Sequence, residues 1–419
     1  MVKETKNSRF NLGLVPRILI AIIIGVLLGQ WLFIPDWFIQ VLVTLSTLFS
    51  SFLNFIIPLM IIGLIVKGIS DLADGAGKLL GLTVGIAYGS TLLAGSLAYL
   101  VGSLLLPLFI TSDTVANVAG AGEGMEPFFS IPLEPMVDVT AAIIFAFLMG
   151  LGISWLKGKH PEEGAVIYSF FSGFEKIIMQ VLRLIIIPLL PIYILGNFAD
   201  LSRSGAIFSI LSVFWRVFLI VIALHLIYLF AMFLVAGGVS GKNPFFYMKN
   251  QVRGYTTALG TQSSAATIPV NVEVSRANGV SKTIGNFVVP LCATIHLAGS
   301  MITITMCALA VTQMYGIPVT FTQILGFIAV LGIAMVAAPG APGGAIMSAL
   351  PFLPMVGIVT DAMQQLMISL YITQDSFGTA ANISGDNAIA VYIDEIYKRD
   401  KSIPESQREA DREPDSVQI

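Results

Sequence analysis

The sequence predicts an all-α polytopic membrane protein. Of its 419 residues, 56% are hydrophobic and 11% are charged, whereas soluble domains carry about 25% charged residues. The charges are clustered, and long apolar runs separate the clusters. This pattern excludes a soluble enzyme and a disordered protein, and the net charge of −3 gives no basic surface for a nucleic acid. The two cysteines, Cys292 and Cys307, fit neither a zinc pattern nor a disulfide framework.

The apolar runs are long enough to cross a membrane as helices, since about 20 helical residues span roughly 30 Å of hydrocarbon. The runs without Asp, Glu, Lys or Arg are 18–35, 37–66, 79–112, 139–156 and 217–241. A further apolar stretch, 165–199, is interrupted by Glu175, Lys176 and Arg183. We therefore expect several transmembrane helices.

The distribution of lysine and arginine predicts the orientation of these helices, because cytoplasmic loops carry the excess of basic residues. If residues 1–12 are cytoplasmic, nearly all basic loop residues lie inside, and the long outer loop 108–138 is acidic. Both termini are then cytoplasmic. The charged tail after about residue 400 is predicted to be disordered.

A proline- and glycine-rich break divides the charge-free segment 283–360. One helix of that length would be roughly four bilayers long, so the segment must fold back. The break, 338–344, contains Pro339 and Pro342 together with three glycines. Such backbone is tolerated in a membrane only inside protein or beside water. We interpret it as the tip of a re-entrant hairpin that enters from outside.

A second re-entrant candidate spans 246–280, whose centre is too polar to face lipid. Its basic flanks, including Lys249 and Arg276, place both ends on the inner side. Paired broken segments that enter from opposite faces indicate a transporter with inverted repeats and a site near the middle of the bilayer. The alternative is that both segments are ordinary kinked helices.

The last span, 361–397, carries polar residues on one helical face, because their spacing is four, three and four. These residues are Asp375, Thr379, Asn382 and Asp386. A carboxylate in the membrane normally has a cationic partner, but 283–374 contains no Lys or Arg. The partners are therefore predicted to come from solution, as a metal cation and a substrate ammonium. The alternative is that the aspartates are solvated at a helix end.

The preceding span is interrupted at 294–300 by polar residues and a glycine. Such a break exposes backbone carbonyls that can bind a cation. His296 within it is either a proton acceptor or a hydrogen-bonded packing residue. The sequence shows no nucleophile–base set and no phosphate-binding glycine loop, so it predicts no enzyme.

These motifs resemble the dicarboxylate/amino acid:cation symporter family, the relatives of glutamate transporters, over residues 12–397. The segments that carry the resemblance are 261–270, 341–347 and 375–386. Within the family, these motifs resemble those of the bacterial sodium-coupled serine/threonine transporters. The resemblance implies eight transmembrane helices plus two oppositely oriented re-entrant helical hairpins. It also implies an elevator-type homotrimer in the cytoplasmic membrane of a prokaryote.

The resemblance divides the chain into a scaffold and a moving transport domain. The scaffold holds 13–66 (helices 1 and 2) and 139–200 (helices 4 and 5). The transport domain holds 79–107 (helix 3), 206–240 (helix 6), 246–280 (hairpin 1), 283–313 (broken helix 7), 321–358 (hairpin 2) and 361–397 (helix 8). The remaining parts are the cytoplasmic N-terminus 1–12, the extracellular loop 108–138 and the cytoplasmic tail 398–419.

The resemblance also implies site residues. For the substrate they are Ser263, Ser264, Ala341, Pro342, Gly343, Gly344, Asp375, Gly378, Thr379 and Asn382. In this set Ser263, Ser264 and Asn382 hold the carboxylate, and Asp375 holds the ammonium. For sodium they are Asp386 with the carbonyls of Cys292, His296 and Asn382 at one site, and the carbonyls of Thr294 and Leu297 at another.

Two departures from the family pattern bear on the substrate. Members that carry acidic substrates have an arginine where this chain has Gly378, and some have a second one where it has Gln262. A second substrate carboxylate would lack a guanidinium and would be costly to bury. We therefore expect symport of a small neutral amino acid, serine-, threonine- or alanine-like, with Na⁺. The alternatives are proton coupling through His296 and symport of an acidic amino acid or C4-dicarboxylate.

A third departure bears on ion coupling. A further family sodium site uses side chains that are here replaced by His296, Ala298 and Leu92. That site is expected to be dismantled, which predicts a lower ion stoichiometry.

Overall fold

The computed structural model describes residues 14–31, 33–73, 78–119, 125–137, 139–205, 207–335 and 343–399. The expected N-terminal segment 1–12, most of the tail 398–419, and the site residues Ala341 and Pro342 lie outside the described residues. Within the described ranges the regular structure is entirely helical.

The helices of the first half are α1 Leu14–Gln30, α2 Asp36–Ala73, α3 Lys78–Leu105, the short η1 Leu106–Leu108, α4 Ser112–Ala119, α5 Val139–Lys159, α6 Pro161–Val181, η2 Leu182–Ile186 and α7 Ile187–Arg203. The second half contains α8 Ile207–Ser240, α9 Pro244–Thr261, α10 Ser264–Ala277, α11 Lys282–Ile295, α12 Ala298–Met314, α13 Phe321–Ala334, α14 Gly344–Ala349, η4 Leu350–Val356 and α15 Asp361–Arg399.

Within the described residues, five helical runs are long and apolar enough to cross a membrane. They are Asp36–Gly63, Leu79–Leu108, Pro161–Arg203, Ile207–Ser240 and Lys282–Met314. The third run joins α6 and α7 through η2, a π-helical segment, of the kind often found at functional sites. The α15 helix is absent from this set although it is long, because its polar face lowers its hydropathy.

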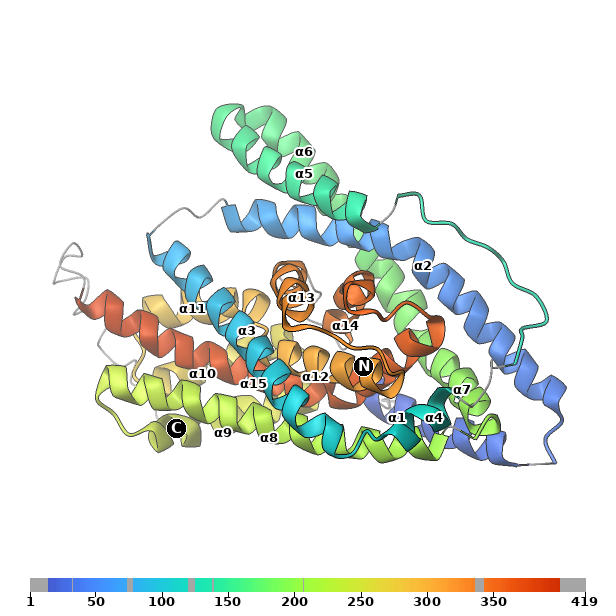
Figure 1. Cartoon of the computed structure of the whole chain (residues 1–419). Coiled ribbons are helices and arrows are strands. Elements are labelled where there is room, and N and C mark those ends of the chain that lie inside the picture. The colour runs from blue at the N-terminus through green and yellow to red at the C-terminus, as the bar shows by residue number, and fades with distance from the viewer. Residues whose placement is uncertain are drawn as a thin grey trace, which may run out of the picture.

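The tertiary contacts divide the helices into two groups. Helices α1, α2, α5, α6 and α7 pack mainly on one another, whereas α3 packs on α11, α12, α13 and α15, and α8 packs on α9, α12 and α15. Figure 1 shows α5 and α6 as a pair that stands away from the other helices, beside α2. Contacts between the groups are sparse. They involve α1 and α7 with α15, α7 with α8, and α2 with α14 and η4. Such a small number of contacts between the groups is typical of two bodies that can move relative to each other.

Two short reversals of the chain have specific causes. Between α9 and α10, Gln262 adopts a left-handed conformation (φ 53°), and Ser263 then caps α10 by accepting the N–H of Ala266 at 3.3 Å. At the start of α14, Gly343 has φ 77°, which glycine adopts without strain. Helix α9 packs along α10, and α13 packs on η4 and α14. Each pair therefore forms a helical hairpin.

The break between α11 and α12 lies at His296 and Leu297, whose backbones leave the helical region (φ −102°, ψ 99° and φ −121°, ψ 39°). The N–H of His296 still bonds the carbonyl of Cys292 at 2.8 Å, which ends α11. Helix α12 then runs through the protein interior, where almost all of its residues are buried. The predicted interruption is thus present, and it lies inside the protein.

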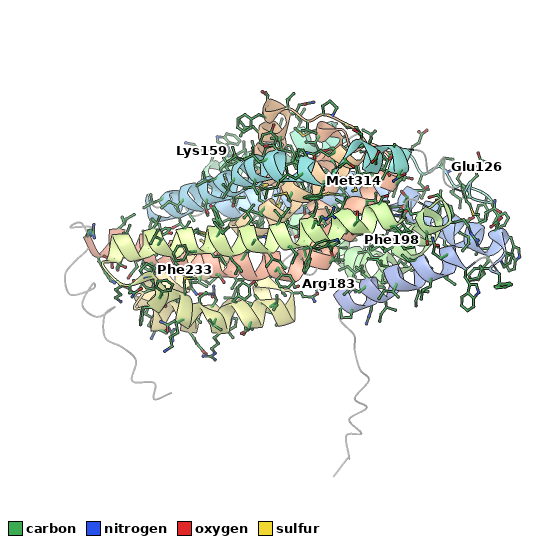
Figure 2. The ribbon with its side chains drawn as sticks, turned by 60° about the horizontal axis from the view of Figure 1, so that its bottom comes forward. Glu126, Lys159, Arg183, Phe198, Phe233 and Met314 are labelled. Carbon is green, nitrogen blue, oxygen red and sulfur yellow. The ribbon has the colours of Figure 1, made fainter. Side chains whose placement is uncertain are left out.

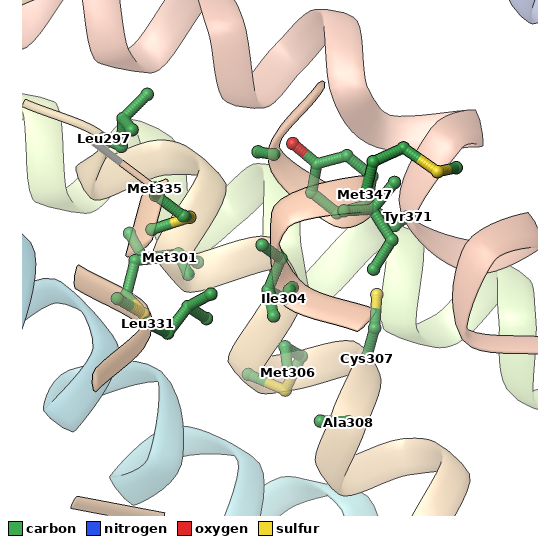
Figure 3. Packing of buried hydrophobic residues seen from close by; sticks show 14 of the residues in the cluster. Leu297, Met301, Ile304, Met306, Cys307, Ala308, Leu331, Met335, Met347 and Tyr371 are labelled. Atoms are coloured by element: carbon green, nitrogen blue, oxygen red, sulfur yellow. The ribbon is translucent and has the colours of Figure 1, made fainter. Parts of the chain in front are cut away.

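Helix α15 forms the centre of the second group and contacts α12, α8, α9, α11 and α10 (Figure 1). Gly299 on α12 allows a close approach, because a Cβ there would lie 2.5 Å from the Gly378 carbonyl oxygen on α15. Tyr371 on α15 belongs to the same buried apolar cluster as Met347 and Cys307 (Figure 3). The polar face of α15 is therefore enclosed by protein on most sides.

Candidate functional site

The four polar residues predicted on one face of the last span are all buried on α15. Asp375, Thr379, Asn382 and Asp386 are at most 6% exposed. The burial of Asp375 and Asp386 excludes the alternative interpretation, in which the aspartates are solvated at a helix end. Burial of ionisable groups inside a membrane is costly and marks a functional site by default.

Asp375 is 4% exposed and receives two hydrogen bonds from other parts of the protein. The Tyr371 hydroxyl donates to its Oδ1 at 2.8 Å, and the backbone N–H of Gly343 donates to its Oδ2 at 2.6 Å. The described residues supply it with no basic partner. An ionised carboxylate accepts about four hydrogen bonds, so an ionised Asp375 would have acceptor capacity left for a cationic ligand.

Asn382 joins α15 to the first turn of α12. Its Oδ1 accepts the N–H groups of Gly299 at 2.7 Å and Ser300 at 3.2 Å, and its Nδ2 donates to the Ser300 hydroxyl at 2.9 Å. Ser300 Oγ also lies 3.3 Å from the Tyr371 hydroxyl. A continuous polar chain therefore connects Asp375 to the break between α11 and α12.

The serine-rich tip lies between α9 and α10. Ser263 is the N-cap of α10, and Ser264, its first residue, is 6% exposed. Ala258, at the end of α9, packs in one cluster with Ala380 and Ile383 of α15, which brings the tip beside the level of Thr379. Free N–H groups at a helix N-terminus favour an anion. The tip therefore suits a carboxylate.

Gly378 faces α12, and the site has room for one more carbon atom there. A Cβ built on it would lie 3.5 Å from Thr303 Oγ1 and 3.6 Å from the Ser300 nitrogen, which are ordinary van der Waals contacts. The Thr379 hydroxyl bonds the carbonyl of Asp375 within α15 at 2.9 Å. A long side chain at position 378 would have to extend along the polar chain just described.

Asp386 follows Asp375 by eleven residues on α15 and is fully buried. Its Oδ1 is 3.0 Å from His296 Nδ1, and its Oδ2 has no hydrogen-bond partner among the described residues. The other imidazole nitrogen of His296 is 3.0 Å from Ser90 Oγ on α3. Gly385 makes room for the ring, because a Cβ there would collide with it.

This arrangement fits a small hard cation, which prefers oxygen ligands. The unpartnered Asp386 Oδ2 supplies a charged ligand. The break at His296 and Leu297 interrupts the helical hydrogen-bond pattern beside it, but the Leu297 carbonyl, a predicted ligand, accepts the N–H of Met301 at 2.8 Å. The described residues contain no group of three or more His, Cys, Asp or Glu that would suit a transition metal. Of the other predicted carbonyl ligands, Cys292 is buried and Thr294 is exposed.

Sequence reasoning missed the side chains that surround these carboxylates. Tyr371 donates to Asp375, Ser300 contacts Tyr371 and Asn382, and Ser90 contacts His296. Tyr371 lies four residues before Asp375 on the same helical face, which is the one signal that could have identified it. Ser90 and Ser300 come from other helices, and no spacing rule connects them to α15.

A broken helix and two helical hairpins that surround buried carboxylates in an apolar, all-helical chain define a polytopic membrane transporter. The model of the Sodium:dicarboxylate symporter family matches residues 14–396, and the chain belongs to this family. It is therefore a cation-coupled symporter of dicarboxylates or amino acids and a multi-pass membrane protein, and it is not an enzyme. The predictions at that level are confirmed.

Proposed function

We propose that this chain imports a small neutral amino acid, serine-, threonine- or alanine-like, together with Na⁺. The observation that carries the proposal is the buried Asp375, which has two hydrogen-bond donors but no basic partner among the described residues. A buried charge without a counter-charge is costly, and a substrate ammonium would neutralise it. In this proposal the N-terminus of α10 receives the substrate carboxylate, which is supported by the packing of Ala258, near the end of α9, with Ala380 and Ile383 of α15.

The absence of an arginine at position 378 supports a neutral substrate. Gly378 faces Thr303 and Ser300, and neither offers a positive charge to a second carboxylate. Gln262 at the hairpin turn is likewise uncharged. An acidic substrate would bring two negative charges to a site that supplies no guanidinium, which disfavours glutamate, aspartate and C4-dicarboxylates.

The division of the helices into two groups supports an elevator mechanism. The helices with the site residues, α10, α12, α14 and α15, all lie in the second group, and sparse contacts join it to the first. In this proposal the second group carries substrate and ions across as one body, and the first is the scaffold of a homotrimer. Both termini are then cytoplasmic.

Transport into proteoliposomes tests the proposal directly. With an inward Na⁺ gradient, labelled serine should accumulate above its external concentration, and replacement of Na⁺ by choline should abolish this accumulation. Excess alanine or threonine should compete, whereas excess succinate or aspartate should not. Competition by succinate or aspartate alone would overturn the substrate assignment.

Proton coupling is the second candidate, because His296 is fully buried between Asp386 and Ser90. An imidazole in this position can exchange a proton with its neighbours. Uptake that does not depend on sodium but is driven by an inward proton gradient would support proton coupling. Sodium-driven uptake that persists in His296→Gln would eliminate it.

Replacing Gly378 with arginine should weaken binding of neutral amino acids at least tenfold and admit acidic ones. A guanidinium three residues from Asp375 on α15 lies on a neighbouring face, where it either pairs with that carboxylate or binds a second substrate carboxylate. Gly378→Ala is the matched control, because its Cβ makes only ordinary contacts. Competition assays with aspartate and serine measure both effects. If Gly378→Arg and Gly378→Ala bind serine and aspartate equally well, position 378 does not select the substrate.

A further inference from the structure

A stripe of polar side chains crosses the exposed face of the long helix formed by α6, η2 and α7. Lys176, Gln180 and Arg183 are all exposed, and their spacing of four and three places them on one side of the helix. Neither the substrate site nor the cation site uses these residues. In Figure 2, Arg183 is labelled among the side chains.

The stripe enters the membrane-spanning part of the helix. Residues 177–199 contain no charge other than that of Arg183, so Lys176 marks the boundary of the apolar segment. Arg183 lies about 10 Å further along the helix axis, within the π-helical segment Leu182–Ile186. An arginine at this depth is expensive unless its head group reaches a polar partner.

The described residues provide no such partner. None of Lys176, Gln180 and Arg183 forms a hydrogen bond or ion pair with them. Glu175 is the nearest acidic residue in the sequence, but it lies about 100° away around the helix from Lys176. The two positive charges therefore need a partner from outside the described chain.

We propose that the stripe of Lys176, Gln180 and Arg183 binds the phosphate head group of an anionic phospholipid. The flanking residues Ile177 and Leu184 are 63% and 65% exposed, so the same surface offers apolar contacts to acyl chains beside two cations. A guanidinium binds phosphate through paired hydrogen bonds, and the Gln180 amide can donate a further one. A phospholipid has this combination of an anionic head and an apolar body.

The lipid site lies on the scaffold group rather than on the moving group. Helix α6 packs on α2 and α5, and these helices contribute no residue to the substrate or cation site. A lipid held there anchors the scaffold at a fixed depth while the second group moves. This consequence rests on the proposed elevator mechanism, whereas the lipid site itself does not.

Lipid binding to the purified full-length chain tests the site without knowledge of the transported substrate. Native mass spectrometry in detergent would compare phosphatidylglycerol with phosphatidylcholine of the same acyl chains. Phosphatidylglycerol should remain bound through delipidation and raise the melting temperature, since a ligand of the folded state stabilises it. Equal binding of the two lipids would overturn the proposal.

Three variants locate the site. The double variant Lys176→Gln, Arg183→Gln should bind phosphatidylglycerol about twenty-fivefold more weakly, taking about fivefold for each basic residue at a membrane surface. Arg183→Lys should retain most of the binding, and Lys159→Gln, which removes an exposed lysine of α5, should retain all of it. Unchanged binding in the double variant overturns the proposal. If cross-linked oligomers disappear in that variant while lipid binding persists, the stripe contacts a second copy of this chain instead.

Discussion

Asp375→Asn should abolish amino-acid binding while the protein still folds. The substitution keeps the shape of the side chain and removes its charge. Because truncating one partner of a buried charge pair costs about 3 kcal/mol, we expect the affinity for the amino acid to fall more than a hundredfold. Equilibrium binding of a labelled amino acid at saturating sodium measures this loss, and size-exclusion chromatography verifies the fold.

Tyr371→Phe is the matched control for this variant. It removes the hydroxyl that donates to Asp375 Oδ1 at 2.8 Å and leaves the carboxylate charge and the Gly343 hydrogen bond in place. Binding should weaken by less than about tenfold, the value of one hydrogen bond. If Asp375→Asn binds its ligand as well as Tyr371→Phe does, the ammonium is held elsewhere and the assignment of a neutral amino acid loses its basis.

The positions of the long helices along the chain could be predicted from sequence, because insertion in a membrane depends on the hydropathy of each consecutive segment. Residues 206–240 were expected as one span, and α8 covers Ile207–Ser240. The interruption at 294–300 was expected, and the chain leaves the helix at His296 and Leu297. In both cases local composition decides the outcome, since charges and unpaired backbone groups are excluded from lipid.

Features outside that rule were not predicted. Helix α4, Ser112–Ala119, lies inside the segment expected to be an outer loop, and nothing in the hydropathy indicates it. The helical period placed Asp375 and Asp386 on one face of α15, but it carries no information about the helix that this face meets. The contact of His296 with both Asp386 and Ser90 brings together residues from the break, from α15 and from α3. Only the packed structure shows it.

Asp386→Asn should weaken the sodium dependence of transport. Asp386 Oδ2 is buried and has no hydrogen-bond partner among the described residues, and an amide in its place offers no charge to a cation. The sodium concentration for half-maximal uptake should rise at least about thirtyfold, the lower end of the cost of losing a buried charge pair. Uptake measured over a range of sodium concentrations at constant ionic strength gives this value.

Asp394→Asn is the control, because Asp394 is equally buried on α15 but pairs with Lys398 and accepts the N–H of Ser281. Its loss should lower the melting temperature and leave the sodium dependence unchanged. Equal shifts of the sodium dependence in both variants would show that α15 is merely distorted, and would remove Asp386 from the cation site.

The same substitution should uncouple substrate affinity from sodium. The proposed cation site at Asp386 lies against the break at His296 and Leu297. The N–H groups of Gly299 and Ser300 bind Asn382, and the Ser300 hydroxyl lies next to Tyr371, which donates to Asp375. A cation that orders the break therefore also fixes the first turn of α12 beside the substrate site. Because coupling between two sites is reciprocal, sodium should raise amino-acid affinity in the unmodified chain, and the same sodium concentration should raise it much less in Asp386→Asn. Binding isotherms for the amino acid, measured with and without sodium, test this coupling between the two sites. If sodium raises the affinity of Asp386→Asn as much as that of the unmodified chain, the coupling does not run through Asp386.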